Sequence, residues 1–283
     1  MFSCGTERGN TCRCCRFFQY NVINTNNKEF PLQNSDVTES ICVVTPVYNE
    51  EGCIEAVIAD WAGHLSKLTP NYKIIAVNDG SRDNTLQKLN ALMLKYPALQ
   101  VHTQENQGHG PALLCGYHLA LKAGHCWTFH VDSDNQFAAS DFIHLWQIRQ
   151  GRPFILGHRK NRHDPPVRIL ISSILRLIIR VFFGTQIKDA NIPYRLIETK
   201  YLAKLLQFIP EGIFAPNIFL SILAAGDGQD LCHIPVEHQE RQTGNPSIIK
   251  WSLIKACMRA SKELLKFGLS FHRALKTLGQ NRA

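Results

Sequence analysis

Two carboxylates stand one residue apart at Asp132 and Asp134, directly after the apolar run 126–131. Mg²⁺ and Mn²⁺ favour oxygen ligands and commonly bridge protein carboxylates and substrate phosphates. Where a strand gives way to a turn, two carboxylates at this spacing can present their oxygens to one cation. The segment is equally compatible with a plain polar turn, so the pair alone does not decide between a metal site and a loop.

Asp79 is a third carboxylate that follows an apolar run, 72–77. It can accept a hydrogen bond from a nucleobase N–H, or it can belong to the turn that starts the following helix. Further along, Asn106, Gly108 and Gly110 permit close backbone approach to a ligand. They do not complete a G-x-G-x-x-G sequence, so the pattern argues against a dinucleotide-binding site of the Rossmann type.

These residues need elements that bring them together, and short apolar runs alternate with helical patterns along the chain. The expected strands are 41–44, 72–77, 99–103 and 126–131, and the expected helices are 50–68, 83–95 and 111–123. This alternation predicts βαβ units and a parallel sheet. Ligands of such sheets bind beyond the carboxyl ends of the strands. The polar residues that gather there are 48–50, 78–81, Asn106 and 132–134.

Size and charge restrict the class of protein. The chain has 283 residues, 45% hydrophobic and 19% charged, which suits one large α/β domain with a substantial core. A net charge of +8 predicts an anionic partner, such as nucleic acid, acidic lipid head groups or phosphorylated substrates. Much of this charge lies in the N-terminal tail and two amphipathic segments, not in a patch interleaved with aromatics, so we expect no nucleic acid partner.

Residues 1–40 differ in composition from the rest, being rich in Asn, Ser, Thr, Cys and Arg without sustained periodicity. We expect a flexible extension here. Its cysteines, Cys4, Cys12, Cys14 and Cys15, match no paired C-x₂-C arrangement, which favours a solvated tail over a zinc site. The first fifteen residues hold no apolar signal-peptide core, and the other six cysteines are dispersed. The sequence therefore predicts a cytoplasmic protein.

Two later segments predict basic amphipathic helices. In 168–183, one polar stripe recurs at steps of four residues, and it consists of Arg168, Ser172, Arg176 and Arg180. The second segment, 251–278, mixes Lys and Arg with Leu, Ile, Phe and Trp. Both patterns are typical of helices that lie on a membrane surface, although 168–183 also fits a core helix whose arginines reach solvent. Neither has the roughly 20 apolar residues that span a bilayer.

Seven motifs in order resemble the family 2 glycosyltransferases over about residues 41–250. They are T-P-V-Y-N-E (45–50), V-N-D-G-S-x-D-x-T (77–85), N-x-G (106–108), D-S-D-x-Q (132–136), G-H-R (157–159), D-x₅-R-L (189–196) and V-x-H-x₂-R-x₂-G (236–244). The resemblance implies a GT-A fold, which is α/β with a Rossmann-like, mostly parallel sheet flanked by helices. It looks most like the dolichyl-phosphate mannose synthase branch. The segment 244–247 has one residue more than the family's Gly-x-Ser.

The resemblance also implies a role for each matched residue. The pocket for base and ribose would be lined by Pro46, Tyr48, Glu50 and Asp79, with Asn106 and Gly108 in the nearby loop. The metal, Mg²⁺ or Mn²⁺, would be held against the donor diphosphate by Asp132 and Asp134, with Gln136 beside it. Phosphates of donor or acceptor would meet Arg159, Arg195 and Arg241. The catalytic set would comprise Asp132, Asp134, Asp189 and Arg195.

The implied reaction is inverting transfer of a hexose from a nucleotide diphosphate sugar, such as GDP-mannose or a UDP-glucose-like donor, to a polyprenyl or dolichyl phosphate. A phosphate acceptor needs a cationic cradle and no general base. Arg195 suits that cradle, or else it pairs with Asp189. A saccharide or glycolipid hydroxyl as acceptor, and a non-catalytic nucleotide-sugar binder, stay as alternatives. We expect a peripheral enzyme at the cytoplasmic face of the membrane, alone or docked on a membrane subunit, with 251–283 as a separate basic helical region.

Overall fold

The computed structural model describes residues 39–160, 166–229, 231–239 and 250–280, all of which belong to the unit 37–283. Apart from Glu39 and Ser40, the predicted extension over residues 1–40 lies outside the described residues. The same holds for Arg241 and for the segment 244–247.

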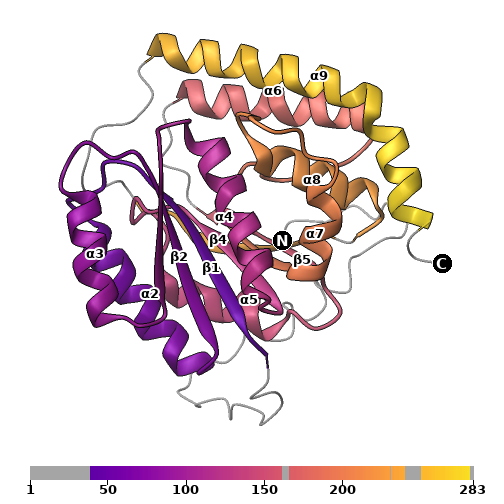
Figure 1. The fold of residues 1–283 in the computed structure, drawn as a ribbon. Helices are drawn as coiled ribbons and strands as arrows, with labels where there is room; N and C mark the ends of the chain where they lie inside the picture. Colours follow the sequence, from indigo (N-terminus) through magenta and orange to yellow (C-terminus); the bar gives the residue numbers. More distant parts are fainter. Residues whose placement is uncertain (1–38, 161–165, 230, 240–249, 281–283) are drawn as a thin grey trace, which may run out of the picture. The chain divides into compact units, whose positions relative to one another are not determined.

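In the described part of the chain, seven strands form one sheet in the order β3-β2-β1-β4-β6-β5-β7 (Figure 1). They are β1 (Ile41–Val47), β2 (Tyr72–Asp79), β3 (Leu99–Gln104), β4 (Trp127–Val131), β5 (Phe154–Lys160), β6 (Tyr194–Glu198) and β7 (Cys232–Glu237). Strand β6 runs antiparallel to both neighbours, and the other pairs are parallel. All strands except β6 therefore share one direction and end at the same edge. The predicted α/β class with a mostly parallel sheet is confirmed.

Helices connect the strands and cover both faces of the sheet. They are α2 (Ile54–Leu68), α3 (Thr85–Lys95), α4 (His109–Ala123), α5 (Phe142–Gln147) after the short 3₁₀ turn η1 (Ala139–Asp141), α6 (Pro166–Phe183), α7 (Thr199–Leu206), α8 (Pro216–Gly226) and α9 (Lys250–Gln280). Phe129 of β4 packs on Trp61 of α2, with ring centroids 5.1 Å apart, while the next residue, His130, meets Tyr117 of α4 at 5.9 Å. Since successive strand residues point to opposite faces, α2 and α4 cover opposite faces.

Two glycines allow α4 to pack without side-chain interference. A Cβ on Gly116 would collide with the side chain of Val44 in β1, so the helix rests directly on the strand. A Cβ on Gly110 would collide with the backbone carbonyl oxygens of Ile213 and Phe214. Gly110 was expected to allow close approach of a ligand. That expectation is wrong, because the backbone that approaches Gly110 belongs to the chain itself.

The two predicted amphipathic segments are helices, α6 and α9, and they lie side by side in Figure 1. Phe183 at the end of α6 packs edge-on against Phe271 of α9 with ring centroids 5.0 Å apart. Phe219 of α8 meets Phe267 of α9 at 4.9 Å. Aromatic contacts thus join these three helices. Within the described residues, no helix combines the length and apolar character needed to cross a bilayer.

Candidate active site

The carboxyl edge of the sheet gathers polar residues from several loops. Asp79 ends β2, Asp132 directly follows β4, Arg159 is the penultimate residue of β5, and His238 directly follows β7. Because these strands are parallel and lie in one sheet, their ends are brought to one edge, where α/β sheets bind ligands. The carboxyl edge of the sheet, where the sequence predicted a site, therefore carries these four residues.

Asp79 organises the loop that follows β3. One carboxylate oxygen accepts hydrogen bonds from the side-chain amide of Gln104 and the backbone N–H of Gln107, both at 2.9 Å, and the other accepts from the Gly108 N–H at 2.8 Å. The side-chain amide of Asn106 donates to the Asp79 carbonyl at 3.0 Å. A carboxylate has about four acceptor positions, so one position is left after these three bonds. The predicted contact with a nucleobase stays a prediction.

The end of β1 is fastened to the neighbouring loops. Glu50 is buried, and its carboxylate accepts a hydrogen bond from the Cys53 thiol at 3.2 Å. Pro46 lies inside β1, and its carbonyl accepts from the Ser133 hydroxyl at 2.9 Å. Tyr48 is half-buried at the rim. Of the residues predicted here for the base and ribose pocket, Glu50 and Pro46 thus fix the shape of the loops, and Tyr48 is the more accessible one.

Asp132 lies among two imidazoles that the sequence analysis did not single out. Its Oδ1 is 3.0 Å from Nε2 of His109, at the start of α4, and 3.3 Å from Nε2 of His130, the penultimate residue of β4. Ligand atoms of the three residues all lie within 4.8 Å of one another. A group of this size can surround a single cation.

The charges of this triad follow from its surroundings. Burial lowers the pKa of His130 to about 4, so its imidazole is neutral near pH 7. Partial desolvation disfavours a charge on His109, but the Asp132 carboxylate raises its pKa above the ordinary value. For Asp132 itself, burial acts to raise the pKa, and the interactions with His109 and His130 overcome it and hold the pKa well below its usual range. Asp132 is therefore an ionised carboxylate across the physiological pH range.

Asp134 and Gln136 shape the loop after β4. An oxygen of Asp134 accepts a hydrogen bond from the Gln136 backbone N–H at 3.2 Å, and Asn135 between them has a positive φ of 58°. The Gln136 side chain donates to the carbonyl of Gln239 at 3.2 Å, and the Gln239 N–H donates back to the Gln136 carbonyl at 2.9 Å. The loop that carries the two aspartates is thus tied to the segment after β7.

A buried polar network contacts His130 on the side of Nδ1, the ring nitrogen that does not face Asp132. The Asn217 amide of α8 lies 3.4 Å from Nδ1 of His130, and the Tyr117 hydroxyl donates to the Asn217 side-chain oxygen at 3.3 Å. Arg195 is the partner of His130 in the β4–β6 register and donates to the Asn217 carbonyl at 2.9 Å. These contacts fix the orientation of the His130 ring under Asp132.

The predicted phosphate contact of Arg195 is wrong. Its side chain is fully buried, and its guanidinium donates to backbone carbonyls of Ala190 and Ile192 as well as to Asn217, and also to the Ser221 hydroxyl. Burial lowers its pKa to about 10, which leaves it charged. The physical reason is that the guanidinium is buried against α8, where backbone carbonyls and the Ser221 hydroxyl take up its donors.

The alternative pairing of Arg195 with Asp189 is also wrong, because Asp189 pairs with Arg159. A terminal nitrogen of Arg159 donates to Oδ2 of Asp189 at 3.2 Å, and both side chains are less than a fifth exposed. The guanidinium also lies over the Phe137 ring, 5.9 Å from its centroid. Of these two arginines, Arg159 is therefore the one whose side chain is partly exposed at the carboxyl edge.

Comparison with known proteins now decides the family. Residues 42–196, more than half of the 283-residue chain, match the family described as glycosyl transferase family 2. The chain belongs to glycosyl transferase family 2. The predicted glycosyltransferase activity is confirmed at the level of this family.

Several relatives of this family 2 member act on lipid phosphates by name. Polyprenol monophosphomannose synthase of Mycolicibacterium smegmatis is 25% identical over 73% of this chain and 80% of its own length. An undecaprenyl-phosphate 4-deoxy-4-formamido-L-arabinose transferase of Pseudomonas fluorescens is 26% identical over 76% of this chain. The match spans only 62% of that second relative's length.

Solved structures confirm the predicted GT-A-type fold of this family 2 glycosyltransferase. Glucosyl-3-phosphoglycerate synthase from Mycobacterium tuberculosis, solved with Mn²⁺, uridine diphosphate and phosphoglyceric acid, has a TM-score of 0.61 and 17% identity. The match covers 82% of this chain and 79% of that one. Another structure of the same enzyme, solved with Mn²⁺, uridine-diphosphate-glucose and phosphoglyceric acid, has a TM-score of 0.60. At this identity the likeness shows the fold alone.

The side chains of this glycosyltransferase fit a divalent cation. Asp132 is an ionised carboxylate, Asp134 stands two residues away in the same loop, and His130 has a buried Nε2 without a directed hydrogen bond among the described residues. Carboxylate oxygens and imidazole nitrogens are both common ligands of divalent cations. His109 and His130 were not among the residues predicted for the site. The sequence holds a hint for each histidine. His130 comes two positions before Asp132, and His109 lies between Gly108 and Gly110.

Proposed function

We propose that this glycosyltransferase transfers a hexose from a nucleotide diphosphate sugar to the phosphate of a polyprenyl phosphate, with inversion at the anomeric carbon. The observation that carries the proposal is the meeting, at one sheet edge, of the Asp79 loop, the Asp132–Asp134 loop and Arg159. The names of the two relatives, which act on polyprenol and undecaprenyl phosphates, support the acceptor class.

A divalent cation is part of the proposal, with Asp132 and Asp134 as its ligands. His109 is a third candidate, because its Nε2 lies 3.0 Å from the Asp132 carboxylate. Mg²⁺ prefers oxygen ligands throughout, so a set that includes an imidazole favours Mn²⁺. When bound, the cation would neutralise the negative charge that develops on the departing diphosphate.

The chain's own residues bind and orient the donor. Asp79 has one acceptor position left for a base N–H, and its three hydrogen bonds hold the loop against which the nucleoside would lie. Arg159 has a buried Nε with no hydrogen-bond partner among the described residues, so its guanidinium keeps a donor for a phosphate oxygen. Arg241, which lies outside the described residues, stays a predicted second phosphate ligand.

The acceptor follows from what the site can do with protons. A hydroxyl acceptor must lose its proton to a general base, whereas a phosphate monoester attacks as an anion. The Asp189 carboxylate, predicted as part of the catalytic set, already accepts a hydrogen bond from Arg159 at 3.2 Å. This engagement supports an acceptor that needs no base. Direct attack by the phosphate oxygen, opposite the departing diphosphate, inverts the sugar.

The surface of α6 supports attachment to a membrane. Four of its large apolar side chains are strongly exposed: Ile174, Leu177, Val181 and Phe182 are 49%, 62%, 68% and 58% exposed. Apolar side chains gathered on one basic amphipathic helix are typical of a face that enters the interfacial region of a bilayer. We infer that this face rests on the membrane from which the polyprenyl phosphate is taken, and a membrane subunit that covers the same face is the alternative.

The test is sugar transfer by the purified full chain. Protein is incubated with Mn²⁺ or Mg²⁺, a short-chain polyprenyl phosphate and radiolabelled GDP- or UDP-sugars, and label is counted in the organic phase. We expect labelled lipid that disappears with EDTA and falls by about 10³-fold in Asp134→Asn, because charge stabilisation of the leaving group is lost. Glu211→Gln removes a carboxylate from an exposed position and serves as the matched control.

The outcomes separate donor from acceptor. If a saccharide is labelled and lipid is not, the hydroxyl-acceptor alternative replaces the polyprenyl phosphate. If metal-dependent donor binding is measurable without any transfer, the donor site stands and the acceptor assignment fails. Folded protein that binds no nucleotide sugar contradicts the roles given to Asp79, Asp132 and Asp134.

A further inference from the structure

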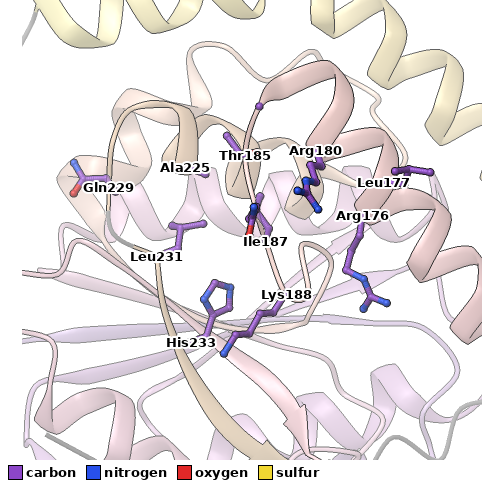
Figure 2. Close-up of a pocket in the computed structure, with 12 residues that line it drawn as sticks. Arg176, Leu177, Arg180, Thr185, Ile187, Lys188, Ala225, Gln229, Leu231 and His233 are labelled. Atoms are coloured by element: carbon purple, nitrogen blue, oxygen red, sulfur yellow. The ribbon is translucent and has the colours of Figure 1, made fainter. Parts of the chain in front are cut away.

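A cavity lies against α6, and none of its lining residues belongs to the carboxyl-edge site. It has a volume of about 750 Å³ and is bounded by α6, the segment 184–188, the carboxyl end of α8 and the start of β7. Figure 2 shows Arg176 and Arg180 reaching down from α6, with Lys188 and His233 on the opposite side. Residues far apart in the sequence thus converge on one space.

The cavity is cationic. Its lining includes Arg176, Arg180 and Lys188, and no Asp or Glu is among the lining residues. Arg176 donates a hydrogen bond to the Ser173 hydroxyl at 2.9 Å. Arg180 and Lys188 form no ion pair within the described part of the chain. Three cationic side chains around a space without a carboxylate create a positive potential that an anion would relieve.

Two buried polar atoms of the lining residues lack hydrogen-bond partners among the described residues. They are the Thr185 hydroxyl oxygen and Nε2 of His233. Buried polar groups in folded proteins are nearly always satisfied, so an unsatisfied pair at a cavity indicates a missing ligand or water. Burial, together with the positive charge of Lys188, lowers the pKa of His233 to about 4, so the ring is neutral near pH 7. Its Nε2 donates or accepts a hydrogen bond according to the tautomer, and a phosphate group offers both oxygen acceptors and a P–O–H donor.

We propose that this cavity binds a phosphate group, held by Arg180 and Lys188 with Thr185 and His233 as hydrogen-bond partners. Arginine and lysine bind phosphate oxygens through charge-assisted hydrogen bonds, and a hydroxyl and an imidazole complete the shell. Leu177, Ile187 and Leu231 also line the cavity and give it an apolar wall. The shared chemistry is a phosphate, and its source is either a membrane lipid or a soluble phosphorylated compound.

The experiment measures phosphate binding by the full chain. Inorganic phosphate is titrated calorimetrically at constant ionic strength, and flotation is measured with vesicles of phosphatidylcholine with and without phosphatidic acid. The test variant combines Arg180→Gln and Lys188→Gln. The control combines Lys67→Gln and Lys95→Gln, which remove two positive charges from exposed positions of α2 and α3, outside the two basic amphipathic helices. We expect a loss of affinity of roughly tenfold or more in the test variant and less than about twofold in the control.

Each outcome supports or overturns the site. Selective loss of inorganic phosphate binding supports a soluble source, and selective loss of the gain that phosphatidic acid gives to flotation supports a lipid source. Equal losses in test and control variants, or no binding of either probe by the unmodified protein, overturn the proposal. Nucleotide-sugar binding is measured on the same samples. Since the donor residues are not altered, retained donor binding shows that the test variant is folded, and absent donor binding in unmodified protein counts against the proposed function instead.

Discussion

The two halves of the sheet place their polar residues differently. In β3-β2-β1-β4, which is wholly parallel, Asp79 is the last residue of β2 and Asp132 directly follows β4. In β6-β5-β7, the side chain of Arg195 in β6 is fully buried. A polar residue at the end of a strand can thus face the ligand crevice, whereas the fully buried Arg195 must be satisfied by the protein.

The helices that cover the two halves also differ in what their side chains face. In the parallel half, α2 and α4 use their apolar faces to cover the sheet. In the other half, α6 leaves Val181 and Phe182 exposed and turns Arg176 and Arg180 towards a cavity. The first half therefore carries Asp79 and Asp132 of the donor site. The second half adds Arg159 to that site and carries the surfaces that we assign to lipid and phosphate.

The largest expected effect is a loss of stability caused by a substitution at a buried residue of the β6-β5-β7 half, Arg195. Arg195→Met removes the charged donor that the carbonyls of Ala190, Ile192 and Asn217 share in a buried site. We expect the free energy of unfolding to fall by about 4 kcal/mol, because buried polar groups lose a charged partner. Urea denaturation followed by circular dichroism measures the change.

Arg159→Met is the matched control for Arg195, since it removes an arginine that lies at the sheet edge. We expect a loss of stability of only about 1 kcal/mol, together with a large loss of sugar transfer. If instead Arg195→Met were stable and inactive, Arg195 would be a phosphate ligand after all, and our correction would fail.

The next effect concerns two glycines at the start of α4, Gly108 and Gly110. Gly110→Ala places a Cβ against the carbonyl oxygens of Ile213 and Phe214, and rigid backbone cannot give way cheaply. We expect a loss of about 3 kcal/mol in unfolding free energy. Gly108→Ala meets no atom within 4 Å, but its φ of 94° disfavours a side chain, so about 1 kcal/mol is expected. Thermal unfolding of both variants compares them, and equal losses would show that α4 does not depend on this close approach.

The parallel half could be predicted from the sequence because its pattern is local. Strands 41–44, 72–77, 99–103 and 126–131 correspond to β1 to β4, and the three expected helices correspond to α2, α3 and α4. β1 runs on to Val47 through Pro46, because the burial of the strand continues past the apolar run. Short apolar runs bounded by polar turns carry this signal without knowledge of the rest of the fold.

The other half could not be predicted in this way, because its order depends on contacts far apart in the sequence. β6 enters between β4 and β5, and no local pattern indicates an antiparallel insertion. Arg195 looks like a phosphate ligand until α8 is placed against it. The pairing of Asp189 with Arg159 spans 30 residues, whereas the rejected partner is six residues away. His109 and Asp132 likewise meet only through the fold.

A smaller effect sharpens the view of the donor half. His109→Asn removes the imidazole 3.0 Å from Asp132 and keeps a polar side chain at the start of α4. We expect Mn²⁺ affinity to fall roughly 10- to 100-fold, as for loss of a ligand or of a partner that orients one. Titration of Mn²⁺ by electron paramagnetic resonance measures it, and His64→Asn on the exposed face of α2 is the control. Unchanged affinity in His109→Asn would remove His109 from the metal site.

The smallest effect tests the helices of the second half at their surface. Val181→Ser with Phe182→Ser removes two side chains that are 68% and 58% exposed, so the folded state loses little apolar burial. Vesicle flotation should weaken by about three- to tenfold, because less apolar surface enters the bilayer interface. Leu94→Ser removes an apolar side chain that is 90% exposed on α3, in the donor half, and should leave flotation unchanged. Equal weakening in both variants would mean that vesicles respond to exposed apolar surface in general. If flotation weakens only in the Val181→Ser and Phe182→Ser variant, the membrane face belongs to α6. Both variants remove exposed apolar side chains, and they differ in where on the molecule those side chains lie.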